Sequence, residues 1–130
     1  TKFITVTVEE GRDQEECRRV AYAIARSPLV KTAFYGEDPN WGRILAAAGA
    51  AGVPFDPDAI SLWIQRENET PLLLFDRGAP AFYFEEEARR IFQASAFRVI
   101  LDLDMGEGED WVWTCDLSHE YVTINGKYRT

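Results

Sequence analysis

The alternation of apolar and polar side chains predicts the first elements of the chain. Residues 3–8 place apolar and β-branched side chains at a period of two, which indicates a strand with one buried face. A helical period follows, because Cys17, Val20, Ala21 and Ile24 are spaced at i, i+3, i+4 and i+7. These four residues share one helix face, so we expect Cys17 to be a small core residue and not a reactive thiol.

Local signals predict where the first two helices begin and end. Asp13 and Glu16 form a capping-box pattern, so the first helix begins after Asp13. It ends before Pro28, because the residue preceding a proline avoids helical geometry. A second helix is predicted from Pro39 onward. Asp38 is its expected N-cap, and Pro39 fits the first helical position, where a backbone N–H has no intrahelical partner.

The rest of the chain predicts more strands and one more helix. Strands are expected at residues 60–64, 72–75, 97–103 and 111–117, the last two as a hairpin-like pair. A third helix opens with the acids at 85–87, which complement the helix dipole. The order strand, helix, helix, strand, strand, helix, strand, strand predicts an α+β fold with helices packed on a mixed or antiparallel sheet.

Composition limits the class of protein. A chain of 130 residues that is 46% hydrophobic can bury the core of one domain, which we place at residues 1–130. The net charge of −8 argues against nucleic acid or an anionic membrane as a partner. No apolar run reaches the length of a bilayer span. Cys17, Cys115 and the single His119 match no zinc or disulfide-motif spacing, so we expect no metal site and a cytoplasmic protein.

Two stretches carry candidate binding chemistry. Near Asp38 and Asn40, helix N–H groups and Arg43 would direct positive charge towards one place, which suits a carboxylate or phosphate. The simpler interpretation is a capped helix whose Arg43 ties down a neighbouring group. An acidic stretch before the last strand suggests a calcium loop, but Gly106 and Trp113 stand where an EF-hand needs ligands. The calcium hypothesis therefore fails.

Thr1 suggests a different chemistry. A threonine at a chain start can act as a nucleophile with its own α-amine as the base. This predicts an N-terminal-threonine amidase or aminopeptidase acting through Thr1. A hypothesis from another class is a non-catalytic acidic α+β interaction module. The residue patterns leave both hypotheses open.

Motifs from one end of the chain to the other resemble a known family. They are residues 1–6 (TKFITV), 27–33 (SPLVKTA), 36–44 (GEDPNWGRI), 113–118 (WTCDLS) and 121–130 (YVTINGKYRT). In their order and spacing they are similar to the ornithine acetyltransferases of arginine biosynthesis, which are also called glutamate N-acetyltransferases. Several long motifs agree at once, so the resemblance is specific.

The resemblance implies an enzyme of the N-terminal-nucleophile type whose precursor cuts itself into α and β chains. The terminal threonine of the β chain takes an acetyl group from N-acetylornithine, and glutamate then accepts it. The α chain supplies an oxyanion hole. No cofactor is implied, although some members use acetyl-CoA as acetyl donor. This chain resembles the C-terminal part of the β chain, whose partners are the α chain and the remainder of the β chain in a heterotetramer of two α and two β chains.

The resemblance also assigns site residues. The family's nucleophile lies upstream in a Met-Ala-Thr-Met-type context, so no catalytic residue is expected here. Thr1 instead matches an internal threonine after a Glu-Gly-Ala whose glutamate binds substrate. Asn125 and Thr130 match positions that bind the amino-acid substrate, through an amide and through a hydroxyl with a terminal carboxylate. Lys127 departs from the family, which commonly has aspartate there.

Overall fold

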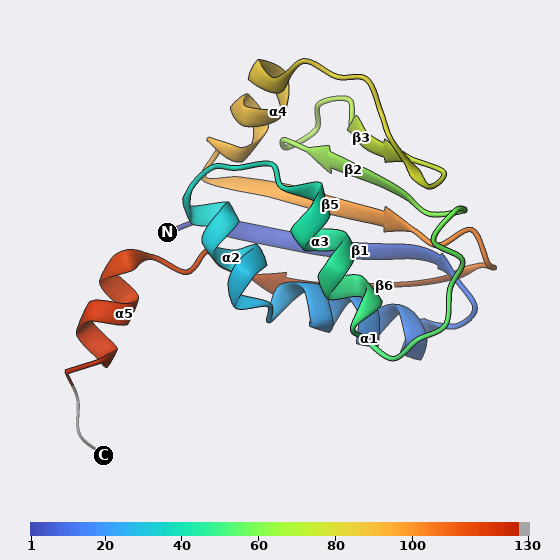
Figure 1. Cartoon of the computed structure of the whole chain (residues 1–130), viewed down its shortest axis with the longest axis horizontal. Helices are drawn as coiled ribbons and strands as arrows, with labels where there is room; N and C mark the ends of the chain where they lie inside the picture. Colours follow the sequence, from blue (N-terminus) through green and yellow to red (C-terminus); the bar gives the residue numbers. More distant parts are fainter. Residues whose placement is uncertain (128–130) are drawn as a thin grey trace.

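The computed structural model describes residues 1–127, which form a six-stranded sheet and five helices (Figure 1). The strands are β1 (Phe3–Gly11), β2 (Ser61–Gln65), β3 (Leu72–Asp76), β4 (Ala79–Pro80), β5 (Ala96–Asp102) and β6 (Gly108–Thr114). The helices are α1 (Gln14–Ala25), α2 (Pro28–Tyr35), α3 (Trp41–Gly49), α4 (Glu85–Phe92) and α5 (His119–Asn125). The strand order is β4-β3-β2-β5-β1-β6.

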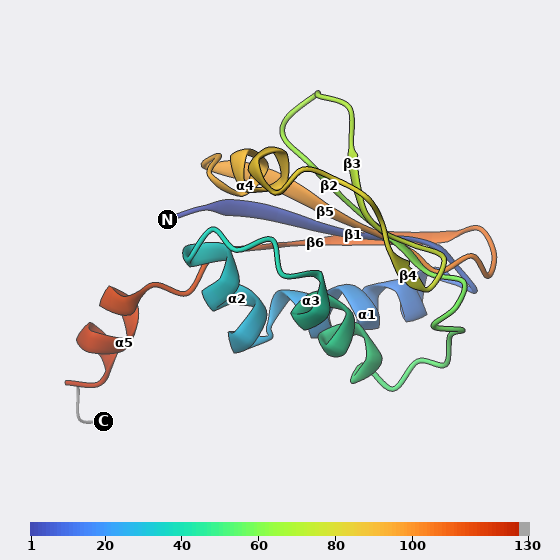
Figure 2. The same ribbon diagram turned by 45° about the horizontal axis from the view of Figure 1, so that its top comes forward.

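The sheet is mixed, which is one of the two alternatives that the sequence left open. β1 pairs with β5 in parallel, and the other described pairs are antiparallel. The predicted α+β fold is therefore confirmed. Three helices, α1, α2 and α3, lie together on one side of the sheet (Figure 2). These helices bury one face of the sheet, and the core lies between them and that face.

Alternate residues of the central strands build that core. Ile4 and Val6 of β1 pair in register with Phe97 and Val99 of β5, and all four are buried. α1 contributes its predicted apolar stripe, which is fully buried: Cys17, Val20, Ala21 and Ile24. The burial of these side chains from water is the main stabilising contribution of this layer.

An aromatic cluster joins α2 and α4 to the same core. The ring centroid of Phe92 in α4 lies 4.5 Å from that of Phe97 in β5, in a stacked arrangement. Phe34 in α2 meets Phe92 and Phe97 edge-to-face at 5.6 and 5.5 Å. These are favourable aromatic geometries, so α4 packs on the face that α2 covers.

The predicted hairpin-like pairing of the last two strands is wrong. β1 lies between β5 and β6 and pairs with both of them. The connection passes around the end of β1, where the Leu103 N–H donates to Glu9 O and the Met105 N–H donates to Glu10 O. β5 and β6 are two strand spacings apart, which is about 10 Å. The five connecting residues, 103–107, can span up to about 17 Å, so they are long enough to cross the end of β1.

Ser27 and Pro28 end one helix and also start another. The Ser27 Oγ accepts a hydrogen bond from the Val30 N–H at 3.3 Å, and Pro28 occupies the first turn of α2. The sequence prediction recognised the end of α1 but missed the short helix α2. Both effects have the same cause, because Pro28 disfavours helical geometry before it and favours a helix after it.

The start of α3 lies two residues later than predicted. Its N-cap is Asn40, whose Oδ1 accepts a hydrogen bond from the Arg43 N–H at 3.0 Å. Asp38 is therefore not the cap, and Pro39 lies before the helix. Asparagine and aspartate are equally good caps, so the sequence offered two candidates and the structure uses the second.

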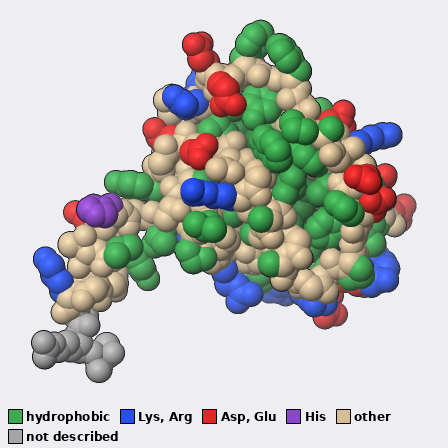
Figure 3. Space-filling model, viewed as in Figure 1, with side chains coloured by type: hydrophobic (Ala, Val, Ile, Leu, Met, Phe, Trp, Pro, Cys, Tyr) green, Lys and Arg blue, Asp and Glu red, His purple; other side chains and the backbone are tan. Residues whose placement is uncertain are grey.

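α5 stands apart from the sheet at one end of the molecule (Figure 1). None of its seven residues is buried. Its hydrophobic side chains, among them Tyr121, Val122 and Ile124, are exposed, and Figure 3 shows such side chains on the projecting helix. The sequence prediction contained no helix at this position. Among residues 1–127, no helix has both the length and the apolar character needed to cross a bilayer.

Candidate functional site

The base of α5 is fastened to the start of the chain. The backbone N–H of Lys2 donates to Asp116 Oδ1 at 2.8 Å, and the Leu117 N–H donates to the Lys31 carbonyl at 3.1 Å. The segment that leads into α5 thus contacts α2 and the residue directly before β1. The two regions expected to border the substrate, the start of the chain and the helix that carries Asn125, are therefore joined at one end of the molecule (Figure 1).

A charged pair strengthens this end. The Lys2 Nζ lies 3.0 Å from Glu37 Oε2 and also donates to the Ala94 carbonyl at 3.2 Å. Only 11% of the Lys2 side chain is exposed, so the pair is shielded from solvent better than a surface ion pair. Lys2 therefore connects β1 to the α2–α3 loop and to the end of α4, while Thr1 before it is exposed.

Asn125 is the last residue of α5 and is exposed. Its Nδ2 donates to the Tyr121 carbonyl at 2.9 Å, one turn back along the helix. A side-chain amide has two donor hydrogens and an acceptor oxygen, so this bond leaves capacity for a ligand. Thr130, the other expected substrate contact, lies outside the described residues.

Arg43 has a structural partner. Its Nη1 donates to the Leu29 carbonyl at 3.0 Å and lies 3.5 Å from Thr32 Oγ1, which ties α3 to the first turn of α2. A groove of about 460 Å³ runs beside this tie, lined by Ser27, Leu29, Asn40, Gly42, Arg43, Ala46 and Ala47. Because the guanidinium engages a carbonyl and Asn40 engages the Arg43 N–H, the geometry favours the interpretation as a capped, tied helix over an anion site.

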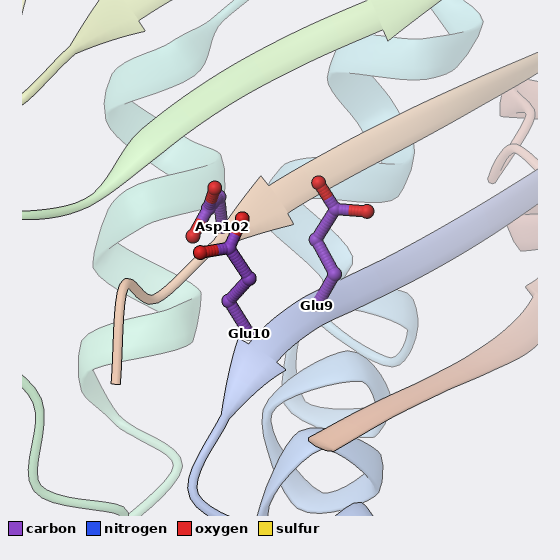
Figure 4. Close-up of side chains that lie close together, drawn as sticks. All are labelled: Glu9, Glu10 and Asp102. Atoms are coloured by element: carbon purple, nitrogen blue, oxygen red, sulfur yellow. The ribbon is translucent and has the colours of Figure 1, made fainter. Parts of the chain in front are cut away.

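A group of carboxylates at the far end of the sheet was not found from the sequence. One oxygen from each of Glu9, Glu10 and Asp102 lies within 4.8 Å of the others (Figure 4). The protonated form of Glu10 donates a hydrogen bond to Asp102, and this bond, together with the charge of Asp102, raises the pKa of Glu10 to about 7. Burial, with the charges of Asp102 and Glu109, raises the pKa of Glu9.

The parallel register explains why the sequence hid this group. Glu9 pairs directly with Asp102 across β1 and β5, although the two are distant in sequence. Three carboxylate oxygens could in principle hold a hard cation such as calcium. A hydrogen bond from protonated Glu10 to Asp102 is sufficient to hold these two carboxyl groups close together, so we assign no metal here.

The two cysteines have different environments. Cys17 is buried beside Gly11, and burial raises the pKa of its thiol. This confirms the prediction that Cys17 is a core residue. Cys115 is exposed in the segment that leads to α5.

Comparison with known proteins gives consistent matches along the chain. The profile of the ArgJ family matches residues 1–130. The chain is 45% identical over 130 residues to the arginine biosynthesis bifunctional protein ArgJ of Chlorobaculum tepidum, and 45% identical over 130 residues to the glutamate N-acetyltransferase of Methanopyrus kandleri. It is 46% identical over 134 residues to the mitochondrial bifunctional ArgJ of Pyrenophora tritici-repentis.

These relatives are much longer than the chain. Each match covers 100% of this chain but 31%, 33% and 29% of the three proteins, so the chain spans about a third of their length. A crystal structure of the bifunctional ArgJ of Bacillus halodurans superimposes with a TM-score of 0.90 at 36% sequence identity. That match covers 98% of this chain and 58% of the solved one, so the fold agrees as well as the sequence.

Proposed function

Because the chain belongs to the ArgJ family, we propose that it forms part of a glutamate N-acetyltransferase of arginine biosynthesis. The observation that carries this proposal is the match over all 130 residues to a protein named for that activity. The proposed reaction moves an acetyl group from N-acetylornithine to glutamate, which gives ornithine and N-acetylglutamate. Acetyl-CoA is the proposed second acetyl donor, as the resemblance implies for some members of the family, and two of the relatives are named bifunctional.

The proposed chemistry proceeds through an acetyl-threonine ester. The threonine hydroxyl attacks the acetyl carbonyl carbon, the C–N bond of N-acetylornithine breaks, and the leaving amine takes the proton. The amine of glutamate then attacks the ester and restores the hydroxyl. Hydrogen-bond donors stabilise the negative oxygen in each step. In this proposal the nucleophile lies outside residues 1–130, and the present chain contributes to substrate binding.

Asn125 and Thr130 are the proposed substrate-binding residues. Both substrates are amino acids that carry a carboxylate, and an amide can donate to one group while accepting from another. The hydrogen bond between Lys2 and Asp116 supports the proposal, because it holds the base of the helix that carries Asn125 against the start of β1. The glutamate expected just before Thr1 would then face the same site.

The proposed assembly is a heterotetramer of two α and two β chains, in which residues 1–130 form one domain at the C-terminal end of the β chain. The proposed compartment is the cytoplasm, as the cysteine pattern suggests. The name of the fungal relative places that protein in the mitochondrion, so the compartment differs within the family.

The test uses the complete protein, with the α chain and the full β chain. We expect N-acetylornithine and glutamate to yield ornithine and N-acetylglutamate in equal amounts. Asn125→Ala should raise the KM for the amino-acid substrate about tenfold, as expected for the loss of about 1.4 kcal/mol of hydrogen bonding. The matched control is Asn68→Ala in the exposed β2–β3 loop, which should leave KM unchanged.

Two outcomes would contradict the proposal. The first is the absence of acetyl transfer in the complete protein. The second is turnover by residues 1–130 alone that Thr1→Ala abolishes, which would instead support the amidase hypothesis. An interaction module would show neither activity nor affinity for glutamate or ornithine in calorimetry.

A further inference from the structure

The second face of the sheet carries large apolar side chains that nothing covers within residues 1–127. Strand residues alternate between faces, so Phe3 of β1 and Trp111 and Trp113 of β6 point away from the core. Their exposed fractions are 53%, 54% and 69%. The Phe3 and Trp113 rings lie 5.9 Å apart, so the exposed aromatics form a continuous surface. We call these three residues the aromatic face.

The helices lie on the opposite side. α1, α2 and α3 cover the core face (Figure 2), and α4 packs on that same face through Phe92. A soluble protein rarely leaves clustered aromatics in water, and such a patch usually marks a contact surface. A hollow of about 370 Å³ beside it can receive side chains of a partner; it is lined by Thr5, Thr7, Arg98, Glu109, Trp111 and Trp113.

One end of this surface is strongly acidic. Glu9 pairs in register with Asp102 on one side and with Glu109 on the other, so all three point to the same face. Among residues 1–127, no lysine or arginine forms a salt bridge with any of these acids. We call Glu9, Asp102 and Glu109 the acidic end. A partner that carries lysine or arginine there would relieve the repulsion among these carboxylates.

We propose that, in the complete protein, polypeptide that precedes Thr1 covers this face, with apolar side chains against the aromatic face and a lysine or arginine against the acidic end. The length of the relatives supports this occupant, since about two thirds of each lies outside the matched region. The inference rests on the proposed placement of the chain at the C-terminal end of the protein but not on the acetyl-transfer activity.

Charge complementarity disfavours a second copy of the same domain. In a pair of identical domains, the aromatic face and the acidic end of one copy would meet the same residues of the other copy. The basic residue that β5 contributes to this face is Arg98. Like charges placed opposite each other across an interface are costly. A different segment, with its own basic residue, complements this surface better.

Hydroxyl-radical labelling of the complete protein tests whether the face is covered. The labelling rate of each residue is divided by its rate in the unfolded protein. We expect Trp111 and Trp113 to be protected several-fold, whereas Phe82, which is 89% exposed on the β4–α4 loop, stays close to the unfolded rate. Normalised rates for Trp113 that equal those of Phe82 would overturn the proposal.

Crosslinking identifies the occupant. Trp113→p-benzoylphenylalanine in the complete protein should yield, on irradiation, adducts with peptides encoded before Thr1. Adducts with a second copy of residues 1–130, or with no peptide at all, would overturn the proposal. Because this readout is independent of turnover, an inactive enzyme with upstream adducts would contradict the proposed function alone.

A charge variant tests the basic group. Glu9→Lys should raise the labelling of Trp111 and Trp113 several-fold, whereas Glu86→Lys on the exposed side of α4 should not. Glu9→Gln, which removes the charge with little change in size, should give a smaller increase in a protein whose circular dichroism is unchanged. Labelling that neither Glu9 variant changes would contradict the presence of a basic partner.

Discussion

The backbone N–H of Lys2 donates a 2.8 Å hydrogen bond to the carboxylate of Asp116, although the two residues are 114 positions apart. This bond fixes the segment before α5 to the first strand of the sheet. α5 itself buries no residue against the sheet, so its position depends on contacts of this segment. The placement of Asn125 therefore depends on an acid that does not touch substrate in our proposal.

Replacement of Asp116 should disturb binding more than chemistry. Asp116→Ala leaves the Lys2 N–H without its charged acceptor, which should lower the free energy of unfolding by about 1–2 kcal/mol. Because α5 loses an anchor, the KM for glutamate should rise while kcat stays close to the parent value. Steady-state kinetics and urea unfolding of the complete protein check this. The exposed acid variant Glu107→Ala should change neither quantity.

Arg43 is expected to contribute stability. Arg43→Ala removes the hydrogen bond to the Leu29 carbonyl, so the free energy of unfolding should fall by about 1 kcal/mol with unchanged substrate affinity. Thermal unfolding and KM measured on the same preparation separate the two quantities. Arg89→Ala, on the exposed side of α4, is the control. A raised KM in a protein of parental stability would restore the anion-site hypothesis.

The Glu10–Asp102 pair should make stability depend on pH. Glu10 titrates at about 7 in the folded protein and near its ordinary value of 4.5 when unfolded. Between these values the folded state holds a proton that the unfolded state has lost, so the free energy of unfolding falls as pH rises through this window. Glu10→Gln removes the titrating carboxyl group, so the variant should not lose this stability as the pH rises.

Melting temperatures between pH 4 and pH 8 provide the measurement. The difference between Glu10→Gln and the parent should increase in favour of the variant across this range. The exposed control Glu86→Gln should give a difference that does not change with pH. If the difference in melting temperature between Glu10→Gln and the parent is also constant with pH, a raised pKa of Glu10 does not contribute to the pH dependence of stability.

The contact between Gly11 and Cys17 predicts a non-additive pair of substitutions. A Cβ at position 11 would collide with the Cys17 Sγ, so Gly11→Ala should cost about 1–3 kcal/mol through overpacking. Adding Cys17→Ala removes the sulfur, so the double variant should lose less than the sum of the single losses.

Gly49 provides the matched control for this pair. A Cβ there meets no atom within 4 Å, so Gly49→Ala should raise the free energy of unfolding by up to about 0.5–1 kcal/mol. Urea unfolding of all four variants gives the comparison. Additive losses for Gly11→Ala and Cys17→Ala would argue against the collision.

Elements whose side chains follow a clear period were predictable from the sequence. The stripe of α1 and the alternation of β1 depend on local spacing alone, and both are buried as expected. Asp13 caps α1 through the Glu16 N–H at 2.8 Å, as its sequence position indicates. Local signals of this kind need no knowledge of distant residues.

Features that depend on distant residues were not predictable in the same way. The pairing of β1 between β5 and β6 is a property of the whole sheet, and the group around Glu9 and Asp102 exists only because of that register. α5 was missed because Val122, Thr123 and Ile124 are β-branched, which favours a strand over a short helix. The family resemblance supplied Asn125 as a candidate, since neither its spacing nor its burial would have singled it out.

The place of β1 between β5 and β6 has a consequence for how the protein is made. β1 leaves the ribosome before the other strands of this sheet, yet its two neighbours comprise residues 96–102 and 108–114, near the other end of the described chain. Both edges of β1 therefore stay unpaired while residues 12–95 are being made, and such edges are prone to wrong pairing. We expect folding to wait for the emergence of Thr114 and to be slow, because its decisive contacts join the most distant parts of the chain.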